Sequence, residues 1–271
     1  MLQQSLQPHG FARFLLSAAV AAILVLGLCG CQTDSLSDIT GSLGEKTEKT
    51  NPAEPRHGLD FYRDRFNANP KDADAALQYG KALRAAGQRS QAVAVLEKAT
   101  IAHPDDKALL AGFGRALADN GNFQQAFDVL SRAHSPDNPD WRILSAQGAV
   151  LDQMGQSEEA RQYYASALRI APDEPSVLSN LGLSYLLAKD LPKAEETLRR
   201  AYGRPDADPR VRLNLALVVG LRGHVAEAES IVKEGRPPEE AAANVTYLRH
   251  ALARNANARA DNAIPAAARG Q

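Results

Sequence analysis

Cysteine is nearly absent from this sequence. The chain of 271 residues has 2 cysteines, Cys29 and Cys31, and none follows residue 31. The long remainder therefore has no thiol, which excludes disulfide bonds and a cysteine-ligated metal site within it. Aromatic residues are also scarce, at 6% of the chain, whereas alanine and leucine are abundant. This composition favours helices.

The chain also lacks an excess of charge and a recognisable catalytic pattern. Its formal net charge is −1, so no overall positive field points to nucleic acid. No glycine-rich phosphate loop is present, and the histidines beyond the N-terminal region are scattered without the spacing of metal ligands or of a nucleophile and its base. These are His57, His103, His134, His224 and His250. We predict that the protein is not an enzyme and binds no cofactor, metal or small-molecule substrate.

Acidic pairs are present, and they have an ordinary explanation. They are Asp105-Asp106, Glu158-Glu159 and Glu195-Glu196. Their positions at helix starts or on exposed faces of the second helix of a pair predict helix caps and solvated charge rather than a site.

The first thirty residues are predicted to be a signal peptide, residues 1–30. Arg13 precedes fifteen residues without a charge, Phe14 to Leu28. This run is too short to span a bilayer comfortably as a permanent helix, but it suits the core of a signal peptide.

The apolar run ends in Leu28-Cys29-Gly30-Cys31, which resembles the bacterial lipobox. In that motif a small residue precedes the cysteine whose sulfur receives the lipid. The motif predicts lipidation of Cys31, because bulky Leu28 would occupy the cleavage position if Cys29 were the acceptor. Several acyl chains on one residue would anchor the protein stably to a membrane. The alternatives are an ordinary secretory signal or a short helix with incidental cysteines.

A polar segment separates Cys31 from the rest. Residues 31–57 are mostly Ser, Thr, Gly, Pro and charged residues. Such a segment cannot bury enough apolar surface to fold, so we predict a flexible tether. Its reach as a coil would be roughly 25–30 Å, from about 5–6 Å times the square root of its length. Gln32, in place of the Asp that commonly retains lipoproteins in the inner membrane, is compatible with the outer membrane facing the periplasm.

From residue 73 the sequence repeats every 34 residues. The five repeats are residues 73–106, 107–140, 141–174, 175–208 and 209–236, and they start at Ala73, Lys107, Trp141, Pro175 and Pro209. Position 8 of each repeat is small: Gly80, Gly114, Gly148, Gly182 and Ala216. Position 24 is large: Leu96, Leu130, Tyr164, Leu198 and Val232. Position 20 is always Ala, and position 15 is Gly except for Lys189.

This pattern is typical of tetratricopeptide repeats. Small residues at positions 8 and 20 allow two antiparallel helices, A and B, to approach closely, while large residues fill the space beside them. A glycine at position 15 suits the tight turn between them. We therefore predict an all-α fold, a right-handed superhelix (α-α solenoid) of five helix pairs. Residues 58–72 are predicted to form an N-terminal capping helix, residues 237–254 a C-terminal capping helix, and residues 255–271 a disordered tail.

The superhelix would present a concave surface formed by positions 2, 5, 9, 12 and 13 of each helix A. In the first three repeats these positions are mixed and polar, but in the last two they include six leucines: Leu183, Leu186, Leu187, Leu213, Leu217 and Leu221. An exposed apolar strip predicts a groove for a protein partner. The alternative is that the C-terminal helix covers part of the strip through Val245, Tyr247 and Leu248.

The last repeat and the segment after it resemble the TadD family, tetratricopeptide lipoproteins encoded with Flp-type (tight adherence) pilus machinery. The resemblance is strongest at Asn214-Leu215-Ala216-Leu217 and at Pro237-Pro238-Glu239-Glu240. It implies a role in pilus assembly, as a pilotin-like factor for the outer-membrane secretin or another assembly component. The alternative is a general envelope scaffold serving outer-membrane protein or cell-wall enzyme complexes.

Overall fold

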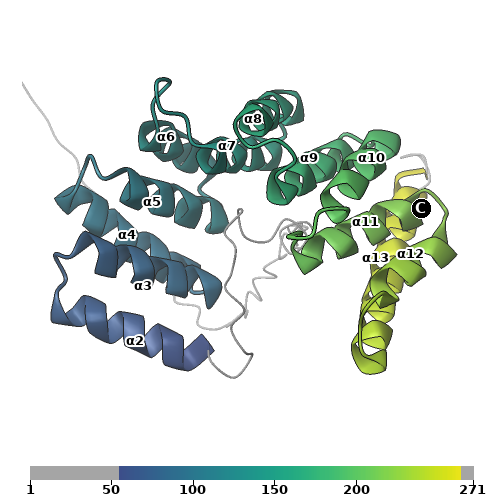
Figure 1. The fold of residues 1–271 in the computed structure, drawn as a ribbon, viewed down its shortest axis with the longest axis horizontal. Coiled ribbons are helices and arrows are strands. Elements are labelled where there is room, and N and C mark those ends of the chain that lie inside the picture. The colour runs from purple at the N-terminus through teal and green to yellow at the C-terminus, as the bar shows by residue number, and fades with distance from the viewer. Residues whose placement is uncertain (1–54, 264–271) are drawn as a thin grey trace, which may run out of the picture. The chain divides into compact units, whose positions relative to one another are not determined.

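The described domain is built from helices alone. The computed structural model describes residues 55–263, and within this range it contains twelve helices and no strand (Figure 1). The predictions for the signal peptide, for Cys31 and for most of the tether lie outside the described residues. No helix in the described range is both long enough and apolar enough to cross a membrane.

Ten of the helices form five consecutive pairs, each with a helix A followed by a helix B. The A helices are α3 (Ala73–Ala85), α5 (Lys107–Asp119), α7 (Trp141–Gln153), α9 (Pro175–Leu187) and α11 (Pro209–Leu221). The B helices are α4 (Arg89–Ala102), α6 (Phe123–Ala133), α8 (Ser157–Ile170), α10 (Leu191–Tyr202) and α12 (Val225–Lys233). Each A helix contacts its own B helix and the A helix of the next pair, so the pairs stack in order of sequence. The prediction of an α-α solenoid is confirmed.

Aspartate side chains begin most of the A helices. Asp72 accepts hydrogen bonds from the backbone N–H groups of Asp74 and Ala75, at 2.9 and 3.2 Å. Asp106 makes the equivalent bonds one repeat later, and Asp140 and Asp208 each accept one. These bonds satisfy donors that have no partner within the helix. Four of the A helices begin with such a cap, and α9, which follows Glu174 without a side-chain cap, begins with Pro175 at the same position of the 34-residue period.

Close contact between helix A and helix B holds each pair together. A Cβ atom added at Gly80, Gly114, Gly148 or Gly182 would lie only 2.5–2.7 Å from the side chain at position 24 of the same repeat. The residues at position 24 are 0–1% exposed. In the fifth repeat the small residue is Ala216 and the large one is Val232, so the extra methyl group on one helix is matched by a smaller side chain on the other.

The turn inside each pair requires a left-handed backbone conformation. Gly155, for example, has φ 78°, a region open to glycine at little cost. Lys189 takes the same position in the fourth repeat with φ 62°, where a side chain is strained. The turn is therefore set by the packing of the two helices and not by the residue that occupies it.

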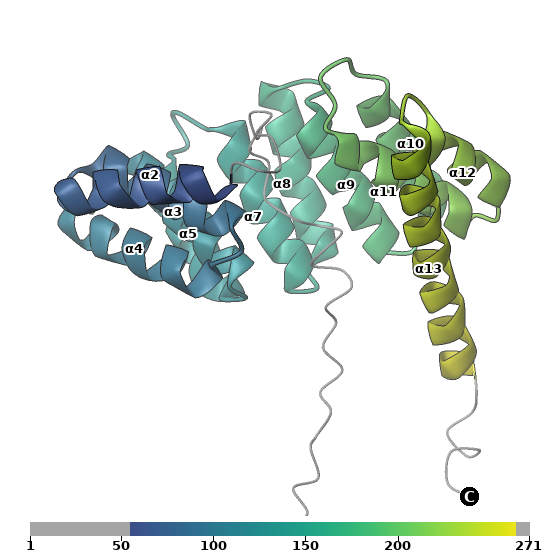
Figure 2. The same ribbon diagram turned by 90° about the horizontal axis from the view of Figure 1, so that it is seen from below.

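Neither capping helix has the predicted bounds: the first begins earlier than expected and ends at Ala68 instead of residue 72, and the second is longer than expected. Helix α2 (Pro55–Ala68) begins before residue 58, because proline suits the first position of a helix. Its first residues had been expected in the tether. Helix α13 (Pro238–Ala263) continues past Arg254, so the prediction of a disordered tail is wrong for residues 255–263. That segment is rich in alanine and contains neither glycine nor proline, which favours continuation of the helix. Figure 2 shows α13 running beside α11 and α12.

Candidate partner-binding groove

The surface of interest is the A-helix face, formed by positions 2, 5, 9, 12 and 13 of α3, α5, α7, α9 and α11. Successive A helices contact one another, which makes this face continuous along the stack. Several of its polar residues are used to join neighbouring repeats, and the six predicted leucines lie on its last two repeats. Its chemistry therefore changes along the chain.

The predicted strip of six exposed leucines is only partly present. Leu183 is 5% exposed and belongs to the core, so its assignment to a partner site is wrong. It is buried because α9 lies between α7 and α11, both of which contact it. The other five are half-buried: Leu186, Leu187, Leu213, Leu217 and Leu221. Among these, Leu186, Leu213 and Leu217 pack against the core cluster that α13 completes.

Helix α13 covers part of the strip, as the alternative prediction stated. Val245 and Leu248 are 7% and 3% exposed and join the core cluster of the fifth repeat. Tyr247, in contrast, is 45% exposed. Leu252, which had not been singled out, lies against α11, since a Cβ added at Gly220 would be 2.8 Å from its Cδ1. Continuing the 34-residue period would have indicated this contact, because it makes α13 the helix A of a sixth repeat that lacks a helix B.

A cleft remains between α11 and α13. Its volume is about 80 Å³, comparable to one aliphatic side chain. It is lined by Arg210, Leu213, Asn214, Leu217, Tyr247, Leu248 and Ala251. Two of the predicted leucines thus form one wall, while α13 supplies the other. The sequence did not predict Asn214 or Ala251 as part of a partner-binding groove, since neither is apolar and large.

Amide and hydroxyl groups connect adjacent A helices in the third to fifth repeats, and one of them, Asn214, also lines the cleft. Asn180 donates to the hydroxyl oxygen of Ser145 at 3.1 Å, and Asn214 donates to Ser179 at the same distance. In both cases position 6 of one repeat bonds position 5 of the repeat before it. Asn214 is 7% exposed and is therefore largely removed from water. Its bond to Ser179 takes the place of a hydrogen bond that the amide would make to water in the unfolded chain.

Two further polar groups on the A-helix face also join repeats. Arg84 pairs with Asp119 at 2.7 Å, with the arginine side chain 6% exposed. Asp152 accepts hydrogen bonds from the hydroxyls of Tyr164 and Ser184, each at 2.9 Å. Burial raises the pKa of Asp152 even though these hydrogen bonds act in the opposite direction. These groups stabilise the stack, and the apolar cleft is the better candidate for binding.

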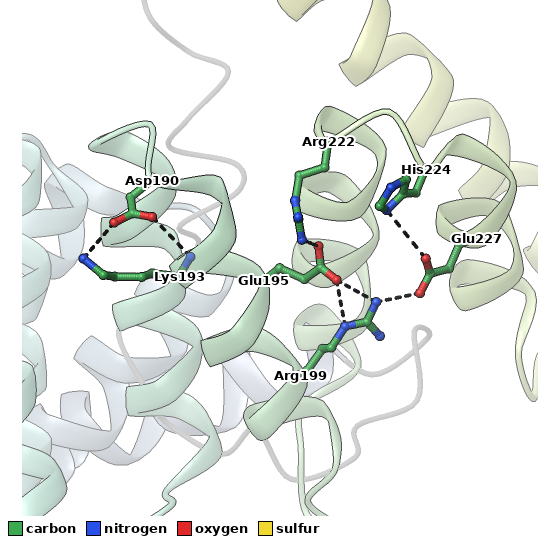
Figure 3. Close-up of polar contacts among 7 residues, drawn as sticks. All are labelled: Asp190, Lys193, Glu195, Arg199, Arg222, His224 and Glu227. Carbon is green, nitrogen blue, oxygen red and sulfur yellow. Dashed lines mark hydrogen bonds and ion pairs between the residues drawn. The ribbon is translucent and has the colours of Figure 1, made fainter.

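An ion-pair network joins the B helices of the fourth and fifth repeats (Figure 3). Glu195 contacts Arg199 at 2.7 Å and Arg222 at 2.5 Å, and Arg199 also reaches Glu227 at 2.6 Å. Glu195 is 7% exposed, so its prediction as a solvated surface charge is wrong. Burial acts to raise the pKa of Glu195, but the two arginines outweigh it and lower that pKa. The network is a structural contact between repeats.

No metal site is evident among residues 55–263, where no group of three or more His, Cys, Asp and Glu side chains is suitably placed. The described residues form an apolar cleft between α11 and α13 and a polar A-helix face whose side chains bond neighbouring repeats.

Two segments of the chain, residues 77–139 and 145–211, match the family model of the tetratricopeptide repeat. Together with the fold, this match shows that these two segments have the tetratricopeptide-repeat pattern within an α-α solenoid. Solenoids of this kind present extended surfaces that bind other proteins. No curated protein sequence matches the chain.

Solved structures share the fold at low sequence identity. PilW, a widely conserved type IV pilus biogenesis factor, matches with a TM-score of 0.59 and 18% identity over 70% of this chain and 90% of its own. The Cut9-Hcn1 structure of the APC/C matches at 0.57 and 18% over 67% of this chain and 36% of its own. The human IFIT1 dimer with m7Gppp-AAAA matches at 0.58 and 13% over 68% of this chain and 46% of its own. This chain thus spans about a third of the matched Cut9-Hcn1 chain and about half of the IFIT1 chain.

Proposed function

We propose that this protein is a lipid-anchored periplasmic scaffold that binds a protein partner at the cleft between α11 and α13. The cleft carries this proposal, since it combines apolar walls with a half-exposed tyrosine at its rim. Aromatic residues at the edge of an apolar cleft are typical of sites that bind proteins. A partner would insert one aliphatic side chain between Leu217 and Leu248.

We further propose that the partner belongs to the Flp (tight adherence) pilus machinery, with the outer-membrane secretin as the first candidate. The support is the resemblance of the last repeat and the start of α13 to the TadD family. The fold likeness to PilW is compatible with this role, because PilW is itself a pilus biogenesis factor. Lipidation at Cys31 would place the scaffold at the inner leaflet of the outer membrane, beside a secretin under assembly.

Affinity capture of the lipidated protein from membranes tests the proposal. The secretin should co-purify with the wild-type chain and not with Leu217→Asp or Tyr247→Ser. Tyr247→Ser changes a half-exposed side chain, so loss of capture in that variant would not reflect loss of folding. Ile101→Asp is a matched control, because Ile101 is 77% exposed and lies on α4, far along the chain from the cleft. Capture that is equal in all four proteins would refute the assignment of the cleft.

Deletion of the gene provides a second test. Secretin multimers should disappear from the outer membrane and return with the wild-type chain. Replacement of Cys31 by Ser should abolish incorporation of a labelled fatty acid and release the protein from the membrane. If secretin multimers form normally without the protein, the secretin is not its client.

The second candidate is a general envelope scaffold for outer-membrane protein or cell-wall enzyme complexes. The same fold occurs in proteins as different as the APC/C complex and human IFIT1. The solenoid fold alone therefore does not identify the protein complex in which this chain works. This candidate predicts that capture yields such complexes instead of pilus components.

A further inference from the structure

Helix α2 is a helix B without a helix A. It begins at Pro55, which is one 34-residue period before Arg89, the first residue of α4. In this register Gly58 occupies position 20 and Tyr62 occupies position 24, the positions that are small and large in every complete repeat. Among the described helices, α2 contacts α3 alone, at the N-terminal end of the stack (Figure 1).

One side of α2 is covered. Leu59 and Phe66 pack against the first core cluster, and the ring of Phe66 stacks on Tyr79 of α3 with centroids 5.5 Å apart. This contact is equivalent to that between a helix B and the helix A of the next repeat, such as α4 with α5. Helix α2 therefore covers the face of α3 that the helix B of a preceding repeat would cover.

The other side of α2 is not covered by any described helix, and on it Gly58 and Tyr62 are half-buried while Phe61 is exposed. A Cβ added at Gly58 would meet no atom within 4 Å, whereas Ala92 and Ala126, its equivalents, are 0% exposed. Phe61 is 63% exposed, while Val129 at the equivalent position 23 is 7% exposed. Within residues 55–263, the ring of Phe61 contacts one aromatic ring, that of its neighbour Tyr62, edge to face at 5.4 Å. In the complete repeats this side is covered by the repeat's own helix A.

The segment one period before the first repeat does not have the sequence pattern of a helix A. The period places Glu45, Lys46 and Lys49 at positions 7, 8 and 11 of the preceding segment. In the five repeats position 8 is Gly or Ala, and even an added Cβ at the glycines would collide with position 24. A lysine there cannot allow the same approach.

A second copy of the chain does not supply it either. Helix α13 is the helix A that has no helix B, but in register its positions 7 and 8 are Arg249 and His250. Both are exposed, and Arg249 pairs with Glu229 at 2.7 Å. This side of α13 is a polar end of the stack and does not fit the apolar side of α2.

We propose that the open side of α2, defined by Gly58, Phe61 and Tyr62, is a docking site for one amphipathic helix of another protein. The complete repeats show what covers such a surface: in four of the five, an antiparallel helix has a large apolar or aromatic residue, then Gly or Ala, and a second large apolar or aromatic residue three positions later, while the third repeat has Gln147 at the first of these positions. Phe113, Gly114 and Leu117 of α5 are one example. The small residue allows the partner helix to approach Tyr62 as Gly148 approaches Tyr164. This site is separate from the cleft between α11 and α13.

A labelled, hydrocarbon-stapled peptide with the sequence of residues 107–119 is the probe, because a free helix of this length is only marginally stable in water. Titration with the mature chain, followed by fluorescence anisotropy, should give saturable binding. Phe61→Asp and Gly58→Leu should each weaken it by about tenfold or more, the loss expected for one large apolar contact. A peptide with Leu in place of its glycine should bind as weakly, while Ile101→Asp should leave binding unchanged.

Other outcomes would overturn the proposal. Absence of saturable binding when the mature chain is added up to millimolar concentration, or equal binding by wild type and Phe61→Asp, would show that α2 is not a docking site. Loss of binding in Leu217→Asp would place the peptide on the A-helix face instead. Concentration-dependent self-association that Phe61→Asp removes would identify a second copy as the occupant. Far-UV circular dichroism of each variant shows that it remains folded.

Discussion

Gly182→Ala should destabilise the repeat domain even though alanine is the better helix former. The added Cβ would lie 2.6 Å from Cγ of Leu198 and 3.0 Å from its Cδ2. Leu198 is 0% exposed, so its side chain has no open space to move into. Overpacking of this kind costs about 1–3 kcal/mol. Alanine for glycine inside a helix recovers about 0.5–1 kcal/mol, which leaves a net loss of about 1 kcal/mol.

The fifth repeat indicates how this loss can be reversed. It pairs Ala216 with Val232 where the fourth repeat pairs Gly182 with Leu198. Leu198→Val alone should cost about 1 kcal/mol, because it removes a buried methylene and leaves a void. In the double variant the new methyl group fills that void, so its stability should be near that of wild type. The two substitutions should therefore couple favourably by about 2 kcal/mol.

Urea unfolding followed by far-UV circular dichroism measures these free energies. Gly58→Ala is the matched control, since it makes the same change in a helix where the new Cβ meets nothing within 4 Å. It should stabilise the domain by about 0.5–1 kcal/mol. The reasoning would be refuted if Gly182→Ala were as stabilising as Gly58→Ala, or if the two substitutions of the double variant were additive.

Three other predictions concern stability. Lys189→Gly should stabilise by about 1 kcal/mol in the same assay by relieving the left-handed strain, and Lys189→Ala should not. Because the folded-state pKa of Glu195 is lowered, its ion pairs stabilise the fold above its ordinary pKa of 4.5, and this is lost as pH falls through the lower folded value. The difference in unfolding free energy between wild type and Glu195→Gln should consequently be largest near neutral pH and shrink in acid, and a constant difference would contradict this. Truncation before Pro238 should cost about 3–5 kcal/mol, since it exposes the core that Val245 and Leu248 cover, and an unchanged melting temperature would show that α13 is not part of the fold.

The sequence by itself determined the repeating architecture. The 34-residue period, the small residues at position 8 and the turn glycines each describe a contact within one helix pair, and five copies of the pattern reinforce one another. The starts of the A helices follow for the same reason, because an aspartate cap is a local interaction. The α-α solenoid and its tetratricopeptide-repeat pattern could be predicted from these local signals.

Only the tertiary structure decided which surfaces are open. Leu183 and Glu195 occupy positions expected to face solvent, yet both are buried by helices from neighbouring repeats. The groove of six leucines became a smaller cleft because α13 packs on α11, and the open side of α2 exists because no described helix covers it. The exposure of a side chain depends on contacts between segments far apart in the chain. The residue pattern of one helix does not show which other helices pack against it.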